Sequence, residues 1–187
     1  MKRITTALLL LSTSLASCSG PFVSPPGNAT EHCLPHAGWS SPQGEPRDPS
    51  TVIAELAKHD IVLLGESHDR QPHHDWQLDT LRQLLAVRPA MLIGLEMFPR
   101  RTQAVLDKWV AGSLTEAQLL DETGWRKGWR FDPALYMRIF RFARDHHIRM
   151  LALNVDPALI RTVSRDGLQA TPLNLREGVG DPAPPSP

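Results

Sequence analysis

The run Ile61-Val62-Leu63-Leu64-Gly65-Glu66-Ser67-His68-Asp69 joins four aliphatic residues to a glycine, a carboxylate and an imidazole. An aliphatic run without polar alternation is typical of a strand covered on both faces, as in a parallel sheet between helices. Gly65 lets the chain turn, and open α/β sheets bind ligands outside the carboxyl ends of their strands. We therefore predict a strand over residues 61–65 that delivers Glu66 and His68 to a ligand site. The alternative is that Glu66 only caps a loop and that His68 is an exposed turn residue.

Two later runs repeat this pattern. Residues 91–95 form a second apolar run that is followed by Glu96, and residues 149–153 form a third that is followed by Asn154. Helical segments separate the runs, and right-handed crossovers of this kind make successive strands parallel. We predict an α/β fold with a parallel sheet of at least three strands, flanked by helices. Glu66 and the two later polar residues would then meet at the carboxyl ends of the strands.

The helix after the first run contributes a further candidate. Pro72 suits a first helical position, because its missing N–H has no partner to lose there. His74 shares one helix face with three leucines at i+4, i+7 and i+11, which are Leu78, Leu81 and Leu85. His74 should therefore be buried beside Glu66 and His68, either as part of a site or as a hydrogen-bonded core histidine.

The segment 124–131 is the most unusual loop, because three aromatic residues are interleaved with three cations. Such a loop could stack on a flat ligand or bind an acidic group. Alternatively, its aromatics anchor the loop to the core while the cations face water. Tyr136, the only tyrosine of the chain, follows in a predicted amphipathic helix over residues 133–146, where packing is the ordinary role.

Residues 1–17 have the features of a lipoprotein signal peptide. A basic start and an apolar stretch precede Leu15-Ala16-Ser17-Cys18, and the segment is too short to span a membrane. We predict that Cys18 becomes the first residue of the mature chain and carries acyl chains such as palmitate. Because Ser19 is not acidic, we expect a lipid-anchored protein of the cell envelope, at an outer membrane facing the periplasm or the surface.

The remaining boundaries follow from composition. Residues 18–50 are rich in Pro, Gly and Ser and read as a tether, residues 51–170 as an α/β domain, and residues 171–187 as a Pro-rich C-terminal segment. Cys33 lies between histidines, but no second cysteine pair completes a zinc site, so we interpret it as an unpaired thiol. Trp39 should pack the end of the tether against the domain.

The composition restricts the partners. The chain has 187 residues, of which 41% are hydrophobic, and this suits one soluble domain with a substantial core. Basic and acidic residues number 20 each, so no positive excess points to a nucleic-acid partner. Removal of the 17-residue signal would leave 170 residues with 18 basic and 20 acidic side chains. Membrane affinity would then come from the lipid rather than from surface charge.

Four separated motifs resemble the ChaN-like haem-binding uptake lipoproteins, which are related to the wider Tiki, TraB and erythromycin-esterase group. The motifs are residues 62–69, His73-His74 followed by Trp76-Gln77, residues 94–100, and residues 150–155. The resemblance extends from about Cys33 to the last residue. It implies an α/β fold, a lipid anchor and a role in haem or iron acquisition.

A haem-binding lipoprotein is the first function that the resemblance implies. The cofactor-binding candidates are the polar residues of the strand ends and adjoining helices: His68, His74, Glu66, Glu96, Asn154 and Tyr136. The family's iron is held by a tyrosine, and tyrosinate is a known axial haem ligand, which makes Tyr136 a candidate. Arginines such as Arg100, Arg101 or Arg126 would pair with the haem propionates.

A hydrolase is the alternative. Relatives carry a Gly-x-x-His element, matched by residues 65–68, and a second-strand glutamate, matched by Glu96, for metal-dependent or general-base hydrolysis. Glu66, His68, His74 and Glu96 would then hold a divalent metal ion or activate water, with the first three as metal ligands. The sequence has no serine nucleophile elbow, Cys-x-x-Cys-His motif or P-loop, which disfavours serine hydrolysis, covalent haem and nucleotide chemistry. We favour the binding protein.

The chain also departs from the family. Members usually continue beyond residues 178–186, and three strands are few for a parallel sheet that must be covered on both faces. We therefore expect a partial family member with an unpaired strand edge. An isolated 170-residue form would then be poorly soluble or would oligomerise, with a homodimer as one candidate state.

Overall fold

The computed structural model describes residues 37–184. The described residues belong to one compact unit. The predicted signal peptide, Cys18 and Cys33 therefore lie outside the described residues. Among residues 37–184, no helix combines the length and the apolar character needed to cross a bilayer.

A small hairpin opens the described part of the chain. Strands β1 (Trp39–Ser40) and β2 (Pro46–Arg47) pair antiparallel within the last part of the predicted tether, and helix α1 (Pro49–Leu56) follows. The ring of Trp39 lies 5.2 Å from the ring of Trp76, measured between centroids. The end of the predicted tether thus packs on the domain, as expected.

Strands β3 (Ile93–Pro99) and β4 (Met150–Asn154) form a parallel pair. Their register shifts near the carboxyl end, where Glu96–Phe98 of β3 lie opposite Leu153 alone. Bulges of this kind redirect side chains and are common beside functional sites. The predicted second and third strands are therefore present, with an irregularity at the strand ends.

The first strand that we predicted, over residues 61–65, is not formed, so the parallel sheet has two strands among residues 37–184. The segment keeps a strand-like alternation, with Leu63 89% exposed and Leu64 half-buried. Gln77 Nε2 donates to the Leu64 carbonyl at 2.8 Å, and a cavity of about 320 Å³ lies between the segment and β3. Paired strands lie roughly 4.8 Å apart. The Leu64 carbonyl therefore accepts a hydrogen bond from a side chain of the next helix and not from a backbone N–H of β3.

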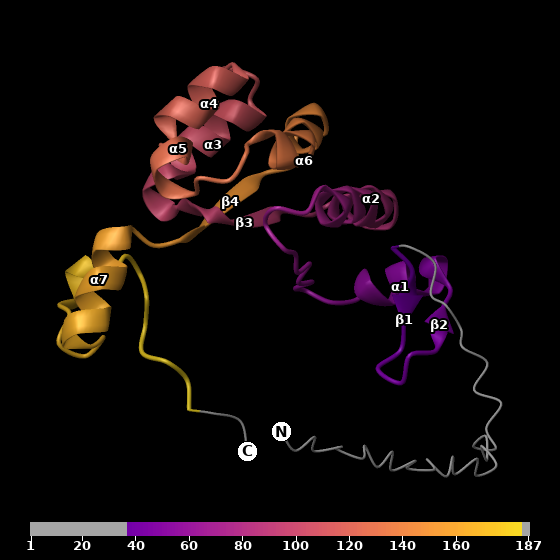
Figure 1. Cartoon of the computed structure of the whole chain (residues 1–187), viewed down its shortest axis with the longest axis horizontal. Coiled ribbons are helices and arrows are strands. Elements are labelled where there is room, and N and C mark those ends of the chain that lie inside the picture. The colour runs from indigo at the N-terminus through magenta and orange to yellow at the C-terminus, as the bar shows by residue number, and fades with distance from the viewer. Residues whose placement is uncertain (1–36, 185–187) are drawn as a thin grey trace, which may run out of the picture. The chain divides into compact units, whose positions relative to one another are not determined.

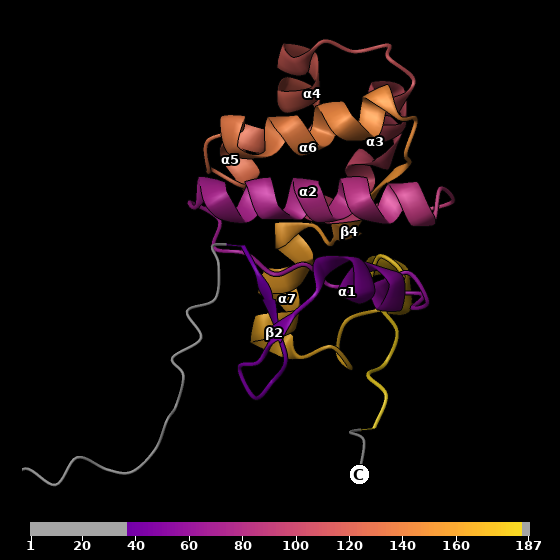
Figure 2. The same cartoon turned by 90° about the vertical axis from the view of Figure 1, so that its right-hand side faces the viewer.

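Helices α2 (Gln71–Val87) and α6 (Ala134–Asp145) lie side by side and cover one face of the two strands (Figures 1 and 2). The predicted buried stripe of α2 is confirmed, because His74 and Leu78 are almost fully buried. The remaining helices are the 3₁₀ turn η1 (Arg100–Thr102), α3 (Gln103–Val110), α4 (Glu116–Glu122), α5 (Trp125–Gly128), α7 (Pro157–Asp166) and η2 (Leu173–Leu175).

The free edge of β4 is closed by a side chain. Gln103 Nε2 donates to the Met150 carbonyl at 2.8 Å, and the Ala152 N–H donates to Gln103 Oε1 at 2.9 Å. This amide replaces the hydrogen bonds that a further strand would make. The opposite edge of the pair, along β3, faces the cavity.

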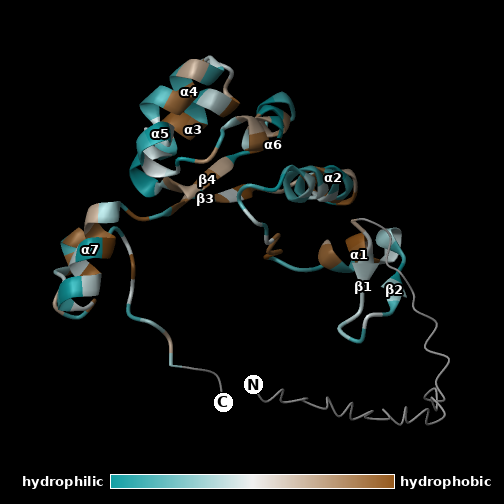
Figure 3. Ribbon diagram, in the orientation of Figure 1, coloured by the Kyte–Doolittle hydropathy of each residue, from teal (hydrophilic) through white to brown (hydrophobic). Residues whose placement is uncertain are grey.

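The second face of the strands is open in the described part of the chain. Leu92 and Leu153 are exposed, and Leu153 crosses so closely over Gly94 that a Cβ on Gly94 would lie 2.7 Å from Leu153 Cδ1. Helix α7 has apolar and polar sides (Figure 3), but its Ile160 is also exposed. The continuous apolar runs predicted that helices would cover both faces of the sheet. Among the described residues, only the face under α2 and α6 is covered.

Candidate functional site

Glu66, His68 and Glu96 converge at the carboxyl ends of the strands. One ligand atom from each residue lies within 4.8 Å of the others. His68 Nδ1 is 2.7 Å from Glu66 Oε1, and His68 Nε2 is 3.6 Å from Glu96 Oε1. The two strand-end carboxylates therefore meet as predicted, although residues 61–65 are not a strand. We call these three residues, with His74 and Tyr136, the His68 site.

Glu66 is the centre of this site, and its side chain is only 9% exposed. Tyr136 donates its hydroxyl hydrogen to Glu66 Oε1 at 3.0 Å, which is the same oxygen that faces His68. His74 Nε2 lies 3.0 Å from Glu66 Oε2 and 3.3 Å from the His68 carbonyl. The hydrogen-bond geometry is met at the carbonyl and not at Oε2. Glu66 Oε2 thus has no hydrogen-bond partner among the described residues.

The tautomer of His68 follows from this contact. A carboxylate only accepts hydrogen bonds, so Nδ1 carries the proton and donates it to Glu66. In the neutral imidazole Nε2 then carries a lone pair. His68 is 35% exposed, and Nε2 faces Glu96, which is 63% exposed. The site therefore presents a basic nitrogen on its open side, oriented by a buried carboxylate.

Tyr136 supports Glu66 rather than opening to a ligand. Its side chain is 2% exposed, and its ring packs against Trp125 and Phe140. Burial, reinforced by the neighbouring Glu66 charge, raises the pKa of Tyr136 well above its usual range. A tyrosine that ligates iron must present an ionised oxygen. In this arrangement the phenol stays protonated and its hydrogen is committed to Glu66.

The aromatic loop lies directly on His68. The His68 ring centroid is 4.5 Å from that of Trp129 and 5.0 Å from that of Phe131, both in edge-on arrangements. Arg130, between them, has a φ of +68°, which residues other than glycine rarely adopt. Trp125 is a buried anchor whose Nε1 donates to the Phe131 carbonyl at 2.8 Å. The anchoring interpretation of the loop is therefore confirmed for Trp125, and stacking of the loop on a ligand stays a prediction.

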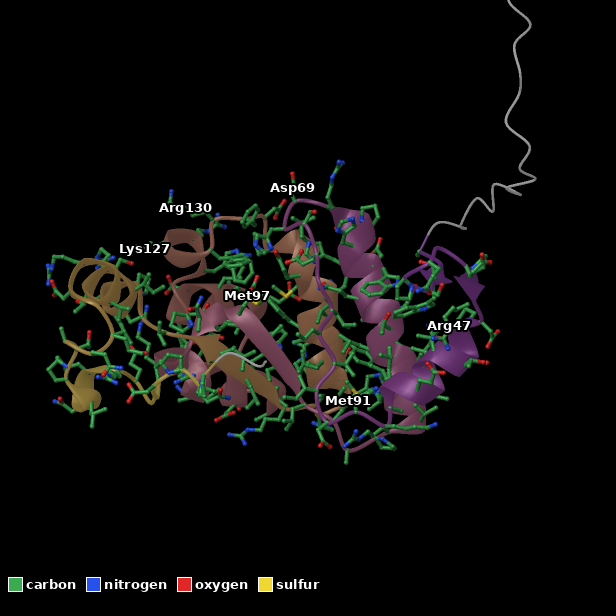
Figure 4. The ribbon with its side chains drawn as sticks, turned by 90° about the horizontal axis from the view of Figure 1, so that it is seen from below. Arg47, Asp69, Met91, Met97, Lys127 and Arg130 are labelled. Carbon is green, nitrogen blue, oxygen red and sulfur yellow. The ribbon has the colours of Figure 1, made fainter. Side chains whose placement is uncertain are left out.

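The cations near the strand ends fall into two groups. Arg101 Nε donates to Asp156 Oδ2 at 2.8 Å, and Arg100 donates to the Glu177 carbonyl, so both are engaged in structural contacts. By contrast, the exposed cations of the aromatic loop make no ion pair within residues 37–184, and they are Arg126, Lys127 and Arg130. In Figure 4 the labelled Lys127, Arg130 and Asp69 all lie in the upper part of the view.

The cavity beside β3 ends at this site. Its apolar lining includes Leu63, Leu64 and Met97, and its polar end is formed by Glu66 and Glu96, the two carboxylates that flank His68. Ligand pockets commonly enclose roughly 300–1,000 Å³, and this cavity, at about 320 Å³, is at the lower limit. The apolar cavity therefore adjoins the two carboxylates of the site.

Asn154, a predicted site residue, and His73, the neighbour of His74, both make hydrogen bonds that hold the local backbone. Asn154 Nδ2 donates to the Glu96 carbonyl at 3.0 Å, so its side chain holds the β3 bulge. The Ser67 N–H donates to His73 Nδ1 at 2.9 Å, which fixes the turn that carries His68. The role of His73 was missed from the sequence. Its position six residues after Ser67, in the first turn of a helix, is the only signal that could have indicated it.

Comparison with known protein families shows which family this chain belongs to. A family model described as haem-binding uptake, Tiki superfamily, ChaN matches residues 52–187. The chain belongs to the ChaN family. The match confirms the resemblance drawn from the four motifs, and it covers every residue of the His68 site. No curated protein and no solved structure gives a significant match.

The residues of this ChaN family member fit the haem that the family description names. Haem is flat and apolar and carries two carboxylates, and its iron accepts an imidazole nitrogen. The His68 site offers such a nitrogen, two aromatic edges in Trp129 and Phe131, an adjoining apolar cavity, and exposed loop cations without a carboxylate partner in the described ranges. The chemistry of the donor set therefore suits haem.

Proposed function

We propose that this protein binds haem for uptake and that His68 Nε2 would hold the iron. The observation that carries the proposal is the 2.7 Å contact between His68 Nδ1 and Glu66, which leaves Nε2 as a lone-pair donor on the open side of the site. Haem ligands of this type are commonly oriented by a second hydrogen bond at the other ring nitrogen. Bound haem would supply the iron centre, and the protein supplies binding and orientation.

The surroundings of His68 support a flat, anionic ligand. Trp129 and Phe131 hold the imidazole in place, and Phe131 is partly exposed at the rim. The cavity beside β3 would take apolar edges of the ligand. Arg126, Lys127 and Arg130 would pair with its carboxylates, because charge-assisted hydrogen bonds to carboxylates are among the stronger ones. Arg100 and Arg101 are less suited, since their present contacts would have to break.

A hemin titration followed by visible absorbance tests the proposal. We expect His68→Ala to weaken hemin binding at least tenfold, or about 1.4 kcal/mol, because it removes the ligand atom. His59→Ala is the matched control, since His59 is exposed and its side chain is not part of the site. Equal hemin affinity of the parent and His68→Ala would overturn the assignment of His68.

A divalent metal site is the second candidate function. Glu66, His68 and Glu96 place one ligand atom each within 4.8 Å, and carboxylates with imidazole suit such ions. For this candidate we propose Glu96 in place of His74 from the predicted ligand set, because His74 Nε2 is directed at the His68 carbonyl and at Glu66. Water activated there would make the protein a hydrolase. Metal analysis of the purified protein, run beside the hemin titration, distinguishes the two: stoichiometric metal without hemin binding favours this candidate.

We also propose that Cys18 is acylated and anchors the protein in the cell envelope, at an outer membrane. The support is the sequence pattern of the first 18 residues, which lie outside the described part of the chain. Metabolic labelling with a fatty-acid analogue tests the anchor. The parent and Cys33→Ala should take up label, and Cys18→Ala should not. Label retained by Cys18→Ala would exclude this attachment site.

A further inference from the structure

We propose that a cavity beside Trp39 and Trp76 binds an organic cation of the quaternary-ammonium class, such as a choline group. We call it the tryptophan cavity. No residue of the His68 site lines it, so the proposal goes beyond haem binding and does not depend on it. Two indole rings, two carboxylates and a lining without basic side chains among the described residues carry the inference.

One face of α2 forms the floor of the tryptophan cavity, and the hairpin with the start of α1 forms its wall. The floor residues follow one another at helical spacing and include Pro72, Asp75, Trp76 and Asp79, and the wall includes Trp39 and Pro49. The cavity encloses about 360 Å³. Ligand pockets commonly enclose roughly 300–1,000 Å³, so a small molecule fits this space.

The two tryptophan rings meet at an angle at this cavity. The ring centroids of Trp39 and Trp76 are 5.2 Å apart, and the ring planes are inclined by 50°. Both side chains are only half-buried, so ring surface stays open beside the contact. Arg47 Nη2 donates to both carboxylate oxygens of Glu55, at 2.8 and 3.0 Å, which attaches the hairpin that carries Trp39 to α1. The face of an indole ring attracts cations that come within roughly 6 Å of its centroid.

Asp75 and Asp79 set the charge that the cavity favours. Asp75 Oδ1 accepts from Gln71 Nε2 at 3.0 Å and from Arg138. Asp79 Oδ1 accepts from Arg82 Nη1 at 2.9 Å. The described residues donate no hydrogen bond to Oδ2 of either carboxylate. Both ion pairs are exposed, and exposed pairs are weak because water screens them. The cavity therefore favours a cation over an anion.

A quaternary ammonium group suits this lining better than a primary amine does. A primary ammonium ion has three N–H donors, and one oxygen of each carboxylate is already used. A quaternary ammonium group has no donor to satisfy. Its methyl groups would lie on the indole faces and on the proline rings, while its charge lies near the carboxylates. Ring faces beside free carboxylate oxygens thus match a trimethylammonium group.

Calorimetric titration of the full chain with choline chloride tests the proposal. We expect saturable binding that the neutral isostere of choline, with carbon in place of nitrogen, does not reproduce. Trp76→Leu should weaken choline binding about tenfold, whereas Trp76→Phe retains an aromatic face and should weaken it about threefold or less. Asp79→Asn should weaken it about threefold, and Asp60→Asn is the matched control, since Asp60 is exposed and does not line the cavity.

A change of opposite sign is expected at Arg82. Arg82→Ala frees Asp79 Oδ1, so it should strengthen choline binding about twofold. A cavity that only supports folding would show no such gain. A soluble short-chain phosphatidylcholine, titrated beside free choline, distinguishes the source of the cation. Equal or tighter binding of the lipid would assign a lipid head group, and weaker binding would assign a free solute.

Several outcomes would overturn the proposal. Absence of choline binding would do so, and equal affinity for the neutral isostere would show an apolar pocket without cation recognition. Choline affinity that is unchanged in both Trp39→Leu and Trp76→Leu would place any binding elsewhere. Binding of a proline oligomer in place of choline would identify a peptide groove. If Trp76→Leu does not fold, Trp39→Leu and Asp79→Asn decide. Failure of the parent to bind hemin would overturn the proposed function and leave this proposal intact.

Discussion

Glu66 and Glu96 follow similar sequences, since each comes after aliphatic residues interrupted by one glycine, but they end in different environments. Glu66 is 9% exposed and accepts hydrogen bonds from His68 and Tyr136. Glu96 is 63% exposed, and the nearest basic atom recorded for it is His68 Nε2 at 3.6 Å. Similar strand-end sequences therefore place one carboxylate in the core and the other at the opening of the same site.

The covering helices cause this difference. His74 from α2 and Tyr136 from α6 both reach Glu66, because these two helices cover the face of the strands toward which Glu66 points. Glu96 follows the buried Leu95 in β3 and points to the opposite, open face. Strand position brings two carboxylates together, and helix packing decides which of them supports the site and which can meet a ligand.

The largest difference between the two carboxylates should appear in stability. Glu66→Ala leaves the buried Tyr136 hydroxyl and His68 Nδ1 without the carboxylate that they contact, so we expect the free energy of unfolding to fall by about 3 kcal/mol. Glu96→Ala removes an exposed side chain and should change it by about 0.5 kcal/mol or less. Urea denaturation of both variants measures this. Equal changes in the two variants would show that burial does not separate their roles.

Alkaline pH provides a second test of the buried side. The pKa of Tyr136 is raised in the folded state, so its contribution to stability is complete below the unfolded value and is lost as pH rises above it. Above about pH 10, folding stability should fall by roughly 1.4 kcal/mol per pH unit through this residue alone. The decline should be shallower by that amount in Tyr136→Phe. Because Tyr136 is the only tyrosine, tyrosinate absorbance reports it directly and should rise only with unfolding.

These residues show which features of the fold and the site could be predicted from the sequence. Local patterns were enough to predict β3, β4, the buried stripe with His74, and the meeting of Glu66 with Glu96. They could not predict that residues 61–65 stay unpaired, because strand pairing depends on the position of a partner strand, and the Leu64 carbonyl accepts from the distant Gln77 side chain instead. The Tyr136 contact joins residues 70 positions apart, so no local pattern contains it.

The exposed side of the site should respond more weakly than the buried side. The double variant Arg126→Ala with Lys127→Ala removes two loop cations, and we expect hemin affinity to fall about fivefold, or roughly 1 kcal/mol, as for exposed ion pairs. Hemin dimethyl ester, which lacks free carboxylates, should bind the parent and this variant equally. Lys58→Ala is the control, because Lys58 is exposed and remote in sequence from the loop. An equal loss for both porphyrins would mean that the cations act through loop structure.

The smallest effect is expected for Glu96→Gln, and it distinguishes the two candidate ligands. If His68 Nε2 binds haem iron, Glu96 lies beside the ligand without a bond to it, and hemin affinity should change less than threefold, or about 0.6 kcal/mol. If the site holds a divalent metal, Glu96 is a ligand, and losing its charge should weaken Mn²⁺ or Zn²⁺ binding tenfold or more. Paired hemin and metal titrations of the parent and Glu96→Gln measure both. A large loss of hemin affinity would place Glu96 with Glu66 inside the binding machinery, and the contrast between a supporting and an open carboxylate would then be wrong.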